Sequence, residues 1–93
     1  MIRSFRNRDS QQVFERLRPT RLPPDILRAA QRKLAILHAA ETLEDLSVPP
    51  GNRLELLSGT RRGQHSIRIN DQWRICFFWR SGDAYQVEIT DYH

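Results

Sequence analysis

The stretch from Gln64 to Trp79, QHSIRINDQWRICFFW, decides the fold class of this chain. It contains two segments that alternate apolar and polar residues, 64–69 and 73–79, on either side of the turn sequence NDQ. A period of two is typical of β-strands, and such a short turn joins strands that run antiparallel. The run ICFFW is apolar on both faces, so the pattern predicts that residues 73–79 form a central strand.

The pattern continues on both sides of this stretch. RLELL (53–57) and AYQVEITDY (84–92) are also predicted strands, linked by the loops SGTRRG and SGD. The alternation in Ile2–Phe5 predicts a further short strand. Asp9 or Ser10 could cap a first helix that presents Val13, Phe14 and Leu17 on one face and stops before Pro19.

The clearest helix of the sequence follows the pair Pro23–Pro24, which suits a helix entry. Its apolar residues Ile26, Ala30, Leu34 and Leu37 recur at helical spacing. The predicted fold class is therefore α+β, a small antiparallel β-sheet with two N-terminal helices packed on one face. Residues 1–93 are too few for two cores, so we expect a single domain.

Composition limits the class of protein. Cys76 is the only cysteine, so an internal disulfide or a cysteine-based metal site is excluded. The longest apolar run, Ile75–Trp79, is too short to span a bilayer, and the first residues lack the apolar core of a signal peptide. These features predict a cytoplasmic, reduced protein without a membrane partner.

The basic residues are unusual in kind. Of the 15 basic residues only Lys33 is lysine, so 14 are arginine. Arginine grips phosphate through a planar fork of donors, which suits RNA or DNA, although a GC-rich genome would give the same composition. Residues 1–53 carry 10 basic and 6 acidic groups, whereas residues 54–93 carry 5 of each. The excess charge therefore lies in the helical half.

Strand geometry brings several titratable residues together. The tight SGD turn sets Trp73 and Arg74 beside Thr90, Asp91 and Tyr92. An arginine that enters an apolar strand needs an anion nearby, because an unpaired buried charge is costly. That anion could be Asp91 or the phosphate of a substrate.

The segment Asp91, Tyr92 and His93 then forms a titratable cluster next to Arg74. Cleavage of a phosphodiester by its own 2′-hydroxyl needs a base, an acid and fixed positive charge, and no metal or other cofactor. The cluster could supply all three. The competing interpretation is a plain strand end, in which Asp91 pairs with Arg74 and His93 has no role.

The segments NRLELLSGTRRGQHSIRINDQWRICFFW and terminal EITDYH together resemble the HigB group of the RelE-like bacterial toxins, and the likeness covers nearly the whole chain. The resemblance implies the toxin of a type II toxin–antitoxin system, a compact endoribonuclease that cuts mRNA on the ribosome and halts translation. It implies as partner an antitoxin of the HigA type with a helix-turn-helix domain, and contact with operator DNA only through the toxin–antitoxin complex.

The resemblance also implies roles for single residues. Arg74 matches an arginine that stabilises charge on the scissile phosphate, and Asp91, Tyr92 and His93 match a C-terminal catalytic cluster. Arg61 matches a substrate-contacting position. Some relatives carry histidine at the position of Glu55, so here Glu55 or the nearby His65 would replace it as base.

The remaining candidates are less specific. Arg62 and Arg68 are plausible RNA contacts, but Arg68 could equally pair with Asp71 or Glu88. His65 alternates with Ile67 on a packed face, so a structural role competes with an RNA-binding or catalytic one. Two rival functions also remain: a toxin of the same fold that poisons DNA gyrase by binding, and a non-catalytic co-repressor. The acid–base ending argues against the gyrase-poisoning rival, which needs no such cluster.

Overall fold

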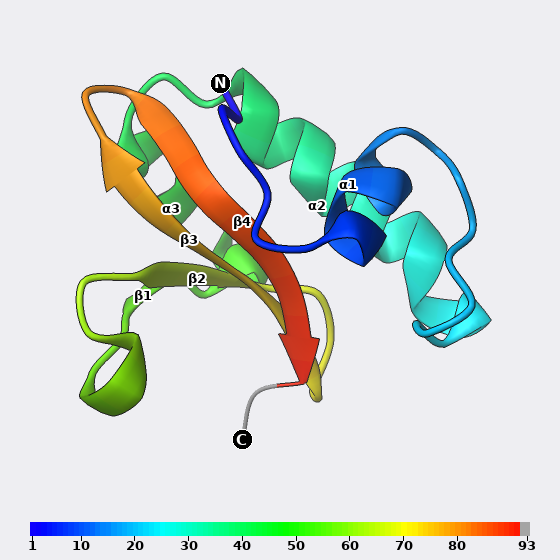
Figure 1. The fold of residues 1–93 in the computed structure, drawn as a ribbon. Coiled ribbons are helices and arrows are strands. Elements are labelled where there is room, and N and C mark those ends of the chain that lie inside the picture. The colour runs from blue at the N-terminus through cyan, green and yellow to red at the C-terminus, as the bar shows by residue number, and fades with distance from the viewer. Residues whose placement is uncertain (92–93) are drawn as a thin grey trace.

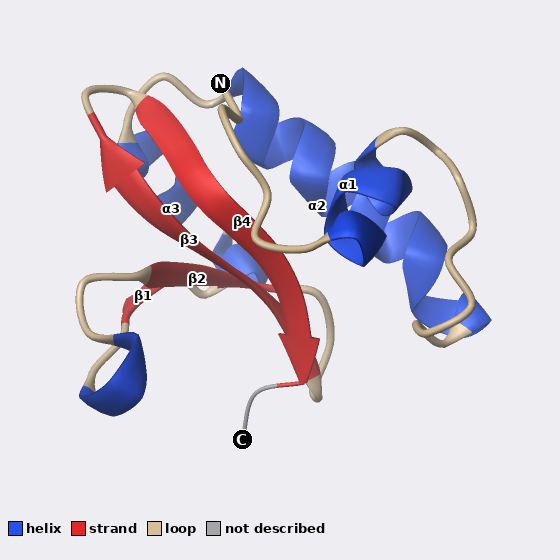
Figure 2. Cartoon of the chain, in the orientation of Figure 1, coloured by secondary structure: helices blue, strands red, loops and turns tan. Residues whose placement is uncertain are grey.

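The structure, a computed structural model, describes residues 1–91. Its helical elements all precede or interrupt the sheet (Figures 1 and 2): α1 (Arg8–Phe14), η1 (Pro24–Ile26), α2 (Leu27–Ala39), α3 (Leu43–Ser47), η2 (Pro50–Asn52) and η3 (Gly59–Arg61), where η marks a 3-10 turn. The strands are β1 (Glu55–Leu56), β2 (His65–Arg68), β3 (Trp73–Arg80) and β4 (Asp83–Asp91). Tyr92 and His93 lie outside the described residues.

The four strands form one sheet in the order β1-β2-β3-β4, and every neighbouring pair is antiparallel. This confirms the predicted meander with β3 as a central strand. The β2–β3 turn is held by Asn70, whose Oδ1 accepts from the backbone N–H groups of Gln72 and Trp73. The β3–β4 hairpin turns through Ser81 and Gly82, both at positive φ, as two-residue hairpin loops require.

The helix α2 covers one face of the sheet and confirms the predicted α+β class. Pro24 begins the entry turn, and the α2 segment packs over β3 and β4. The side chains predicted to face the core are all buried, against apolar residues of the three longer strands: Ile26, Ala30, Leu34 and Leu37 against Ile67, Ile75, Phe77, Val87 and Ile89. We name this the helix face of the sheet.

The predicted cap of the first helix was wrong. Asn7 caps α1, because its Oδ1 accepts from the backbone N–H of Ser10 at 2.9 Å. Ser10 is buried inside the helix, and its hydroxyl accepts from the N–H of Ile89 on β4 at 2.9 Å. The helix ends at Phe14, so Leu17 lies beyond it and is half-exposed instead of lying on the packed face.

The N-terminal segment lies alongside β4 but is not a continuous strand. Ile2 and Phe5 form isolated parallel bridges with Ala84 and Val87, so the predicted strand is reduced to two single bridges. The N–H of Ile2 also donates to Nδ1 of His38 on α2 at 3.1 Å. No helix of the described residues is both long and apolar enough to cross a membrane.

Candidate functional site

Alternate residues of a strand point to opposite faces of the sheet, and here the face away from the core carries polar residues. Arg74 stands opposite Thr90, Cys76 opposite Glu88, and Glu55 opposite Ser66. Directly opposed residues of an antiparallel pair project on the same face, so these side chains share one surface. We name it the open face. Its polar core is the charged cluster, which we define as Glu55, Arg61, Ser66, Arg74, Glu88 and Thr90.

Arg74 is the most constrained member of the charged cluster. Its side chain is only 11% exposed. Nε donates to the hydroxyl of Ser66 at 2.7 Å, and Nη2 donates to the carbonyl oxygen of Arg53 at 2.6 Å. These neutral acceptors satisfy the guanidinium without removing its charge, because a carbonyl or hydroxyl adds no negative charge.

The counter-ion of Arg74 is Glu55 and not Asp91. The Oε1 of Glu55 lies 3.8 Å from Nη2, and the Glu55 side chain is 54% exposed. Asp91 stands opposite Trp73, on the other face of a regular strand pair, and its Oδ2 accepts from Gln72 Nε2 at 2.8 Å. The Asp91–Arg74 pair that the sequence suggested is therefore replaced by a Glu55–Arg74 pair that is long and exposed on the Glu55 side.

The hydrogen bonds of the Arg74 guanidinium use only two of its three nitrogens. Within residues 1–91 Nε and Nη2 donate, whereas no hydrogen bond of Nη1 is formed. Nη1 is also not among the buried atoms without a partner, which in these residues comprise only Nδ1 of His65. The bonds of Nε and Nη2 restrict the orientation of the guanidinium, and Nη1 retains donors for a further acceptor.

Arg61 reaches the open face from the loop between β1 and β2. Its Nη1 donates to Gln64 at 3.2 Å and to Glu88 at 3.0 Å, and its Nη2 lies 3.5 Å from the hydroxyl of Thr90. Glu88 also lies 3.8 Å from Nε of Arg6. The loop with η3 therefore folds over the sheet and brings a second guanidinium to the face that holds Arg74.

Cys76 lies between the two arginines along the sheet, but its thiol is not poised for reaction. It is fully buried. Burial raises the pKa of the Cys76 thiol, an effect that nearby Arg61 and Arg74 oppose and that Glu88 reinforces. The thiolate is accordingly scarce at neutral pH, and Cys76 serves as packing beneath the charged cluster.

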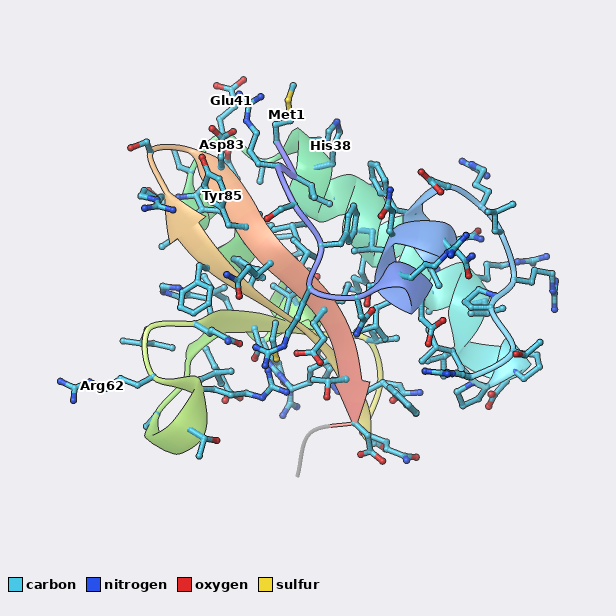
Figure 3. All side chains as sticks on the ribbon, in the orientation of Figure 1. Met1, His38, Glu41, Arg62, Asp83 and Tyr85 are labelled. Atoms are coloured by element: carbon cyan, nitrogen blue, oxygen red, sulfur yellow. The ribbon has the colours of Figure 1, made fainter. Side chains whose placement is uncertain are left out.

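Two other predicted residues, Arg68 and Arg62, lie away from the charged cluster or at its edge. Arg68 stands opposite Arg74 in the sheet, and its guanidinium pairs with Asp71, one of the two partners expected for it. Arg62 is exposed and points outward from the loop (Figure 3). These two positions can extend a basic surface but do not contact the fixed Arg74 edge.

His65 lies on the helix face. It stands opposite Phe77 and stacks on that ring, with 6.2 Å between ring centres. Nδ1 is buried without a hydrogen-bond partner in residues 1–91, and burial lowers the pKa of the imidazole. The structure therefore does not bring His65 to Arg74. Of the two residues suggested as a replacement base, Glu55 and His65, only Glu55 lies on the open face.

The arrangement combines two oriented guanidinium groups with exposed and partly exposed carboxylates. Such a set can in principle bind a phosphodiester and stabilise charge that develops on it. The described residues contain no group of three or more histidine, cysteine, aspartate or glutamate side chains placed to hold a metal ion. Ser66, the Arg53 carbonyl and Glu88 were missed as site residues, although the alternation that places Arg74 also places Glu88 on its face.

A small α+β fold with a charged, hydrogen-bonded cluster on the sheet face opposite α2 defines the structural class. The chain belongs to the HigB-like toxin family, since the model of that family matches residues 3–93. The family is described as the RelE-like toxin of the type II toxin–antitoxin system HigB. Its fold agrees with that family. Membership of a type II toxin–antitoxin family also implies an antitoxin partner.

Individual relatives agree with this assignment. The chain is 44% identical over 85 residues to Toxin HigB-1 of Vibrio cholerae serotype O1, with 90% of each chain covered. It is 30% identical over 93 residues to Endoribonuclease HigB of Proteus vulgaris, with both chains covered completely. An uncharacterised protein of Haemophilus influenzae is 33% identical over 65 residues, which is 70% of this chain and 64% of that protein.

Proposed function

We propose that this toxin is an endoribonuclease that cuts mRNA on the ribosome and so inhibits translation. The observation that carries the proposal is the Arg74 guanidinium, which Ser66 and the Arg53 carbonyl orient through Nε and Nη2 while Nη1 makes no hydrogen bond within residues 1–91. A similar protein of Proteus vulgaris is named an endoribonuclease, which supports the same chemistry here.

Arg74 would donate to a non-bridging oxygen of the scissile phosphate and stabilise the negative charge that grows there. Arg61 would contact the strand beside it, since both arginines occupy the open face. The 2′-hydroxyl would lose its proton to a base and attack the adjacent phosphorus. The 5′-oxygen would then leave with a proton from an acid, which balances the reaction without a metal ion.

Glu55 is a candidate for the base, because its carboxylate lies beside Arg74 and is open to solvent. Asp91, Tyr92 and His93 are the further candidates for acid and base. The strand register brings the chain past Arg74 at Thr90, immediately before these three residues. Their assignment to the reaction rests on the family resemblance.

Action on the ribosome is supported by the charge of the helical half. A hollow of about 640 Å³ between α1 and α2 is lined by Arg16, Arg28 and Arg32 together with Gln31 and His38. Clustered arginines on a surface away from the charged cluster suit the phosphate backbone of a structured RNA. The antitoxin would be of the HigA type with a helix-turn-helix domain, and operator DNA would be bound through the toxin–antitoxin complex.

Primer extension on mRNA after brief induction tests the cleavage directly. We expect new 5′ ends within translated codons, and their absence in a catalytic variant such as Arg74→Ala. Purified ribosomes should show the same cuts with EDTA present at a concentration that leaves them intact. Cuts that require added divalent metal would contradict the metal-independent route.

Pulse labelling separates this function from the gyrase-poisoning and co-repressor alternatives. Amino-acid incorporation should fall first after induction, before thymidine incorporation changes. An early loss of DNA synthesis with continued translation would favour gyrase poisoning. Normal labelling of both, together with operator binding in the presence of the antitoxin, would leave only the co-repressor.

A further inference from the structure

A second feature of the open face is a hollow of about 400 Å³ beside the β3–β4 hairpin. It is lined by Phe78, Trp79, Arg80, Tyr85 and Gln86, and we name it the aromatic hollow. Phe78 stands opposite Tyr85 in the sheet, and it follows Arg74 and Cys76 at every second position of β3. The two rings therefore share the face that holds the charged cluster. Figure 3 shows Tyr85 close to the hairpin end.

A β-bulge opens the sheet at this point. The β3–β4 pairing shifts between Cys76 and Phe78, and Gln86 adopts a positive φ of 51°. The backbone N–H of Gln86 donates to the hydroxyl of Ser4 at 2.9 Å, which holds the irregular conformation. Its exposed side-chain amide makes no hydrogen bond with residues 1–91. A bulge of this kind redirects a side chain, and here it places the Gln86 amide, with its free donor and acceptor, at the rim of the aromatic hollow.

Arg80 is the cation of the aromatic hollow. Its guanidinium carbon lies 4.8 Å from the centre of the Tyr85 ring. Asp83 stands opposite Arg80 in the sheet, but its carboxylate is engaged by Arg3 at 3.2 Å and by the amino group of Met1 at 3.4 Å. Within the described residues the Arg80 guanidinium has no ion pair or hydrogen bond. Its charge is therefore available to a ligand.

The aromatic hollow is connected to the charged cluster by the loop that carries Arg61. Gly63 of that loop lies so close to Phe78 that a Cβ atom added to it would stand 3.5 Å from the ring. Arg61 and Arg62 precede this contact directly. Phe78 is four residues from Arg74, which corresponds to about 13 Å along an extended strand. A single nucleic-acid strand of a few nucleotides covers such a distance along the loop.

We propose that the aromatic hollow binds an unstacked nucleobase of the mRNA whose scissile phosphate lies at Arg74. This inference rests on the proposed function. The base stacks against Phe78 and the Arg80–Tyr85 pair, since ring faces and guanidinium planes both accept bases. Arg80 meets the adjoining phosphate, and the amide of Gln86 hydrogen-bonds the base edge. The hollow thus fixes the register of the strand at one site while cleavage occurs at the other.

The combination of groups favours RNA over a protein partner. The rings of Phe78 and Tyr85 match the stacking face of a nucleobase. The Arg80 guanidinium matches the phosphate of the nucleotide, and the Gln86 amide matches the polar edge of the base. The bulk of the apolar surface on this hairpin is already packed, since Trp79 also contacts the core and Ala84 is buried. The exposed apolar area is therefore small, whereas protein-binding patches are larger.

Photo-cross-linking on ribosomes tests the proposal. The mRNA carries a 2′-deoxynucleotide at the cleavage position, which removes the attacking hydroxyl, and 4-thiouridine at successive positions around it. We expect one position to cross-link to Phe78 or Tyr85, located by mass spectrometry in the tryptic peptides Ile75–Arg80 and Ser81–His93. Cross-links confined to other segments of the toxin would overturn the proposal.

Affinity measurements give a second, independent readout. Tyr85→Leu should weaken binding of the toxin to the mRNA-programmed ribosome by about 5- to 150-fold, the range found for loss of one stacked base. Tyr85→Phe keeps the ring and should lose far less, whereas Val48→Ala, at an exposed position outside both sites, should bind as the wild type does. Equal affinities of Tyr85→Leu and Tyr85→Phe would overturn the proposal.

The two proposals fail in different ways. If the wild type cuts mRNA normally and no cross-link forms at the aromatic hollow, only the nucleobase site is wrong. If the cross-link forms but the unmodified mRNA is never cut, the nucleobase site is supported and the endoribonuclease proposal is wrong.

Discussion

The hydroxyl of Ser66 accepts a 2.7 Å hydrogen bond from Nε of Arg74 across the β2–β3 pair, in a part of the sheet where both residues are buried. Ser66 stands opposite Cys76, two pairs along from the Arg68–Arg74 pair, so the contact is diagonal between neighbouring positions on the same face of the sheet. This bond restricts the orientation of the guanidinium and leaves Nη1 without a hydrogen bond in residues 1–91. Ser66 is therefore a positioning residue in the proposed reaction.

Ser66→Ala should reduce kcat/KM about tenfold or more. A hydrogen bond to a charged group contributes about 1.5–3 kcal/mol, and its loss frees the guanidinium to rotate. Ser10→Ala is the matched control, since its hydroxyl is also buried and accepts from Ile89 at 2.9 Å, but lies away from the charged cluster. Cleavage assays and urea unfolding of both variants separate the effects. Loss of stability alone in both variants would refute the positioning role.

Arg74→Lys should be almost as inactive as Arg74→Ala. Arginine bonds to Ser66 and to the Arg53 carbonyl with two of its nitrogens and has a third for the phosphate. Lysine keeps the charge but has a single nitrogen, so it cannot make all of these contacts in the same geometry. Removal of one such donor costs about 3–4 kcal/mol of barrier, which lowers kcat by two to three orders of magnitude. Cleavage rates on purified ribosomes measure this, with exposed Arg18→Lys as control. Near-normal kcat in Arg74→Lys would show that charge alone suffices.

Glu55→Gln should lower kcat if Glu55 is the base. Glutamine preserves size and polarity but cannot take a proton, and loss of a general base typically costs 10²- to 10⁴-fold, so a fall of about 100-fold or more is expected. Glu44→Gln, on an exposed position of α3, is the control. Unchanged kcat in Glu55→Gln would transfer the base role to Asp91 or His93 and leave Glu55 as the counter-ion of Arg74.

His65 should make the toxin less stable in acid. Burial lowers the pKa of His65 from its usual 6.5, so the unfolded chain binds the proton more readily than the folded one. The free energy of unfolding therefore decreases as pH falls through about 6.5 and continues to decrease until the folded pKa is reached. His65→Phe keeps a ring against Phe77 but removes the titration. Urea unfolding at pH 7.5 and 5.5 should show a smaller difference for the variant, and an equal difference would contradict this role.

The local features of the fold were predictable because short-range patterns determine them. The alternation around Arg74 and the tight turns at each end of β3 fix the register to within a residue or so, and the β-bulge between Cys76 and Phe78 then places Thr90 opposite Arg74. The buried face of α2 follows from helical spacing in the same way. The cap of α1 was not predictable from its neighbours, since Asn7, Asp9 and Ser10 all have side chains that can cap. The bond between Ser10 and Ile89, remote in sequence, decides the choice.

The charged cluster was only partly predictable because some of its contacts join distant segments. Glu55 becomes the partner of Arg74 through β1, which has only two residues and carries little pattern of its own. Arg61 meets Glu88 only because the loop with η3 folds back over the sheet. The face of His65 was visible in the sequence, since it alternates with Ile67, and the structure confirms that face.

The last prediction concerns His93, which the family resemblance makes a candidate acid or base. Removal of His93 should abolish killing, and His93→Gln should give a folded toxin with at least about 100-fold lower cleavage that still binds the antitoxin. The reason is chemical, since glutamine keeps a polar side chain but cannot exchange a proton near neutral pH. If His93 has no catalytic role, either change should alter stability by only about half a kcal/mol and leave toxicity intact. A growth assay at matched soluble levels, with antitoxin co-purification as the folding control, compares the wild type and both variants. Equal killing by all three would rule out a catalytic role for His93 and leave Glu55 as the candidate base beside Arg74.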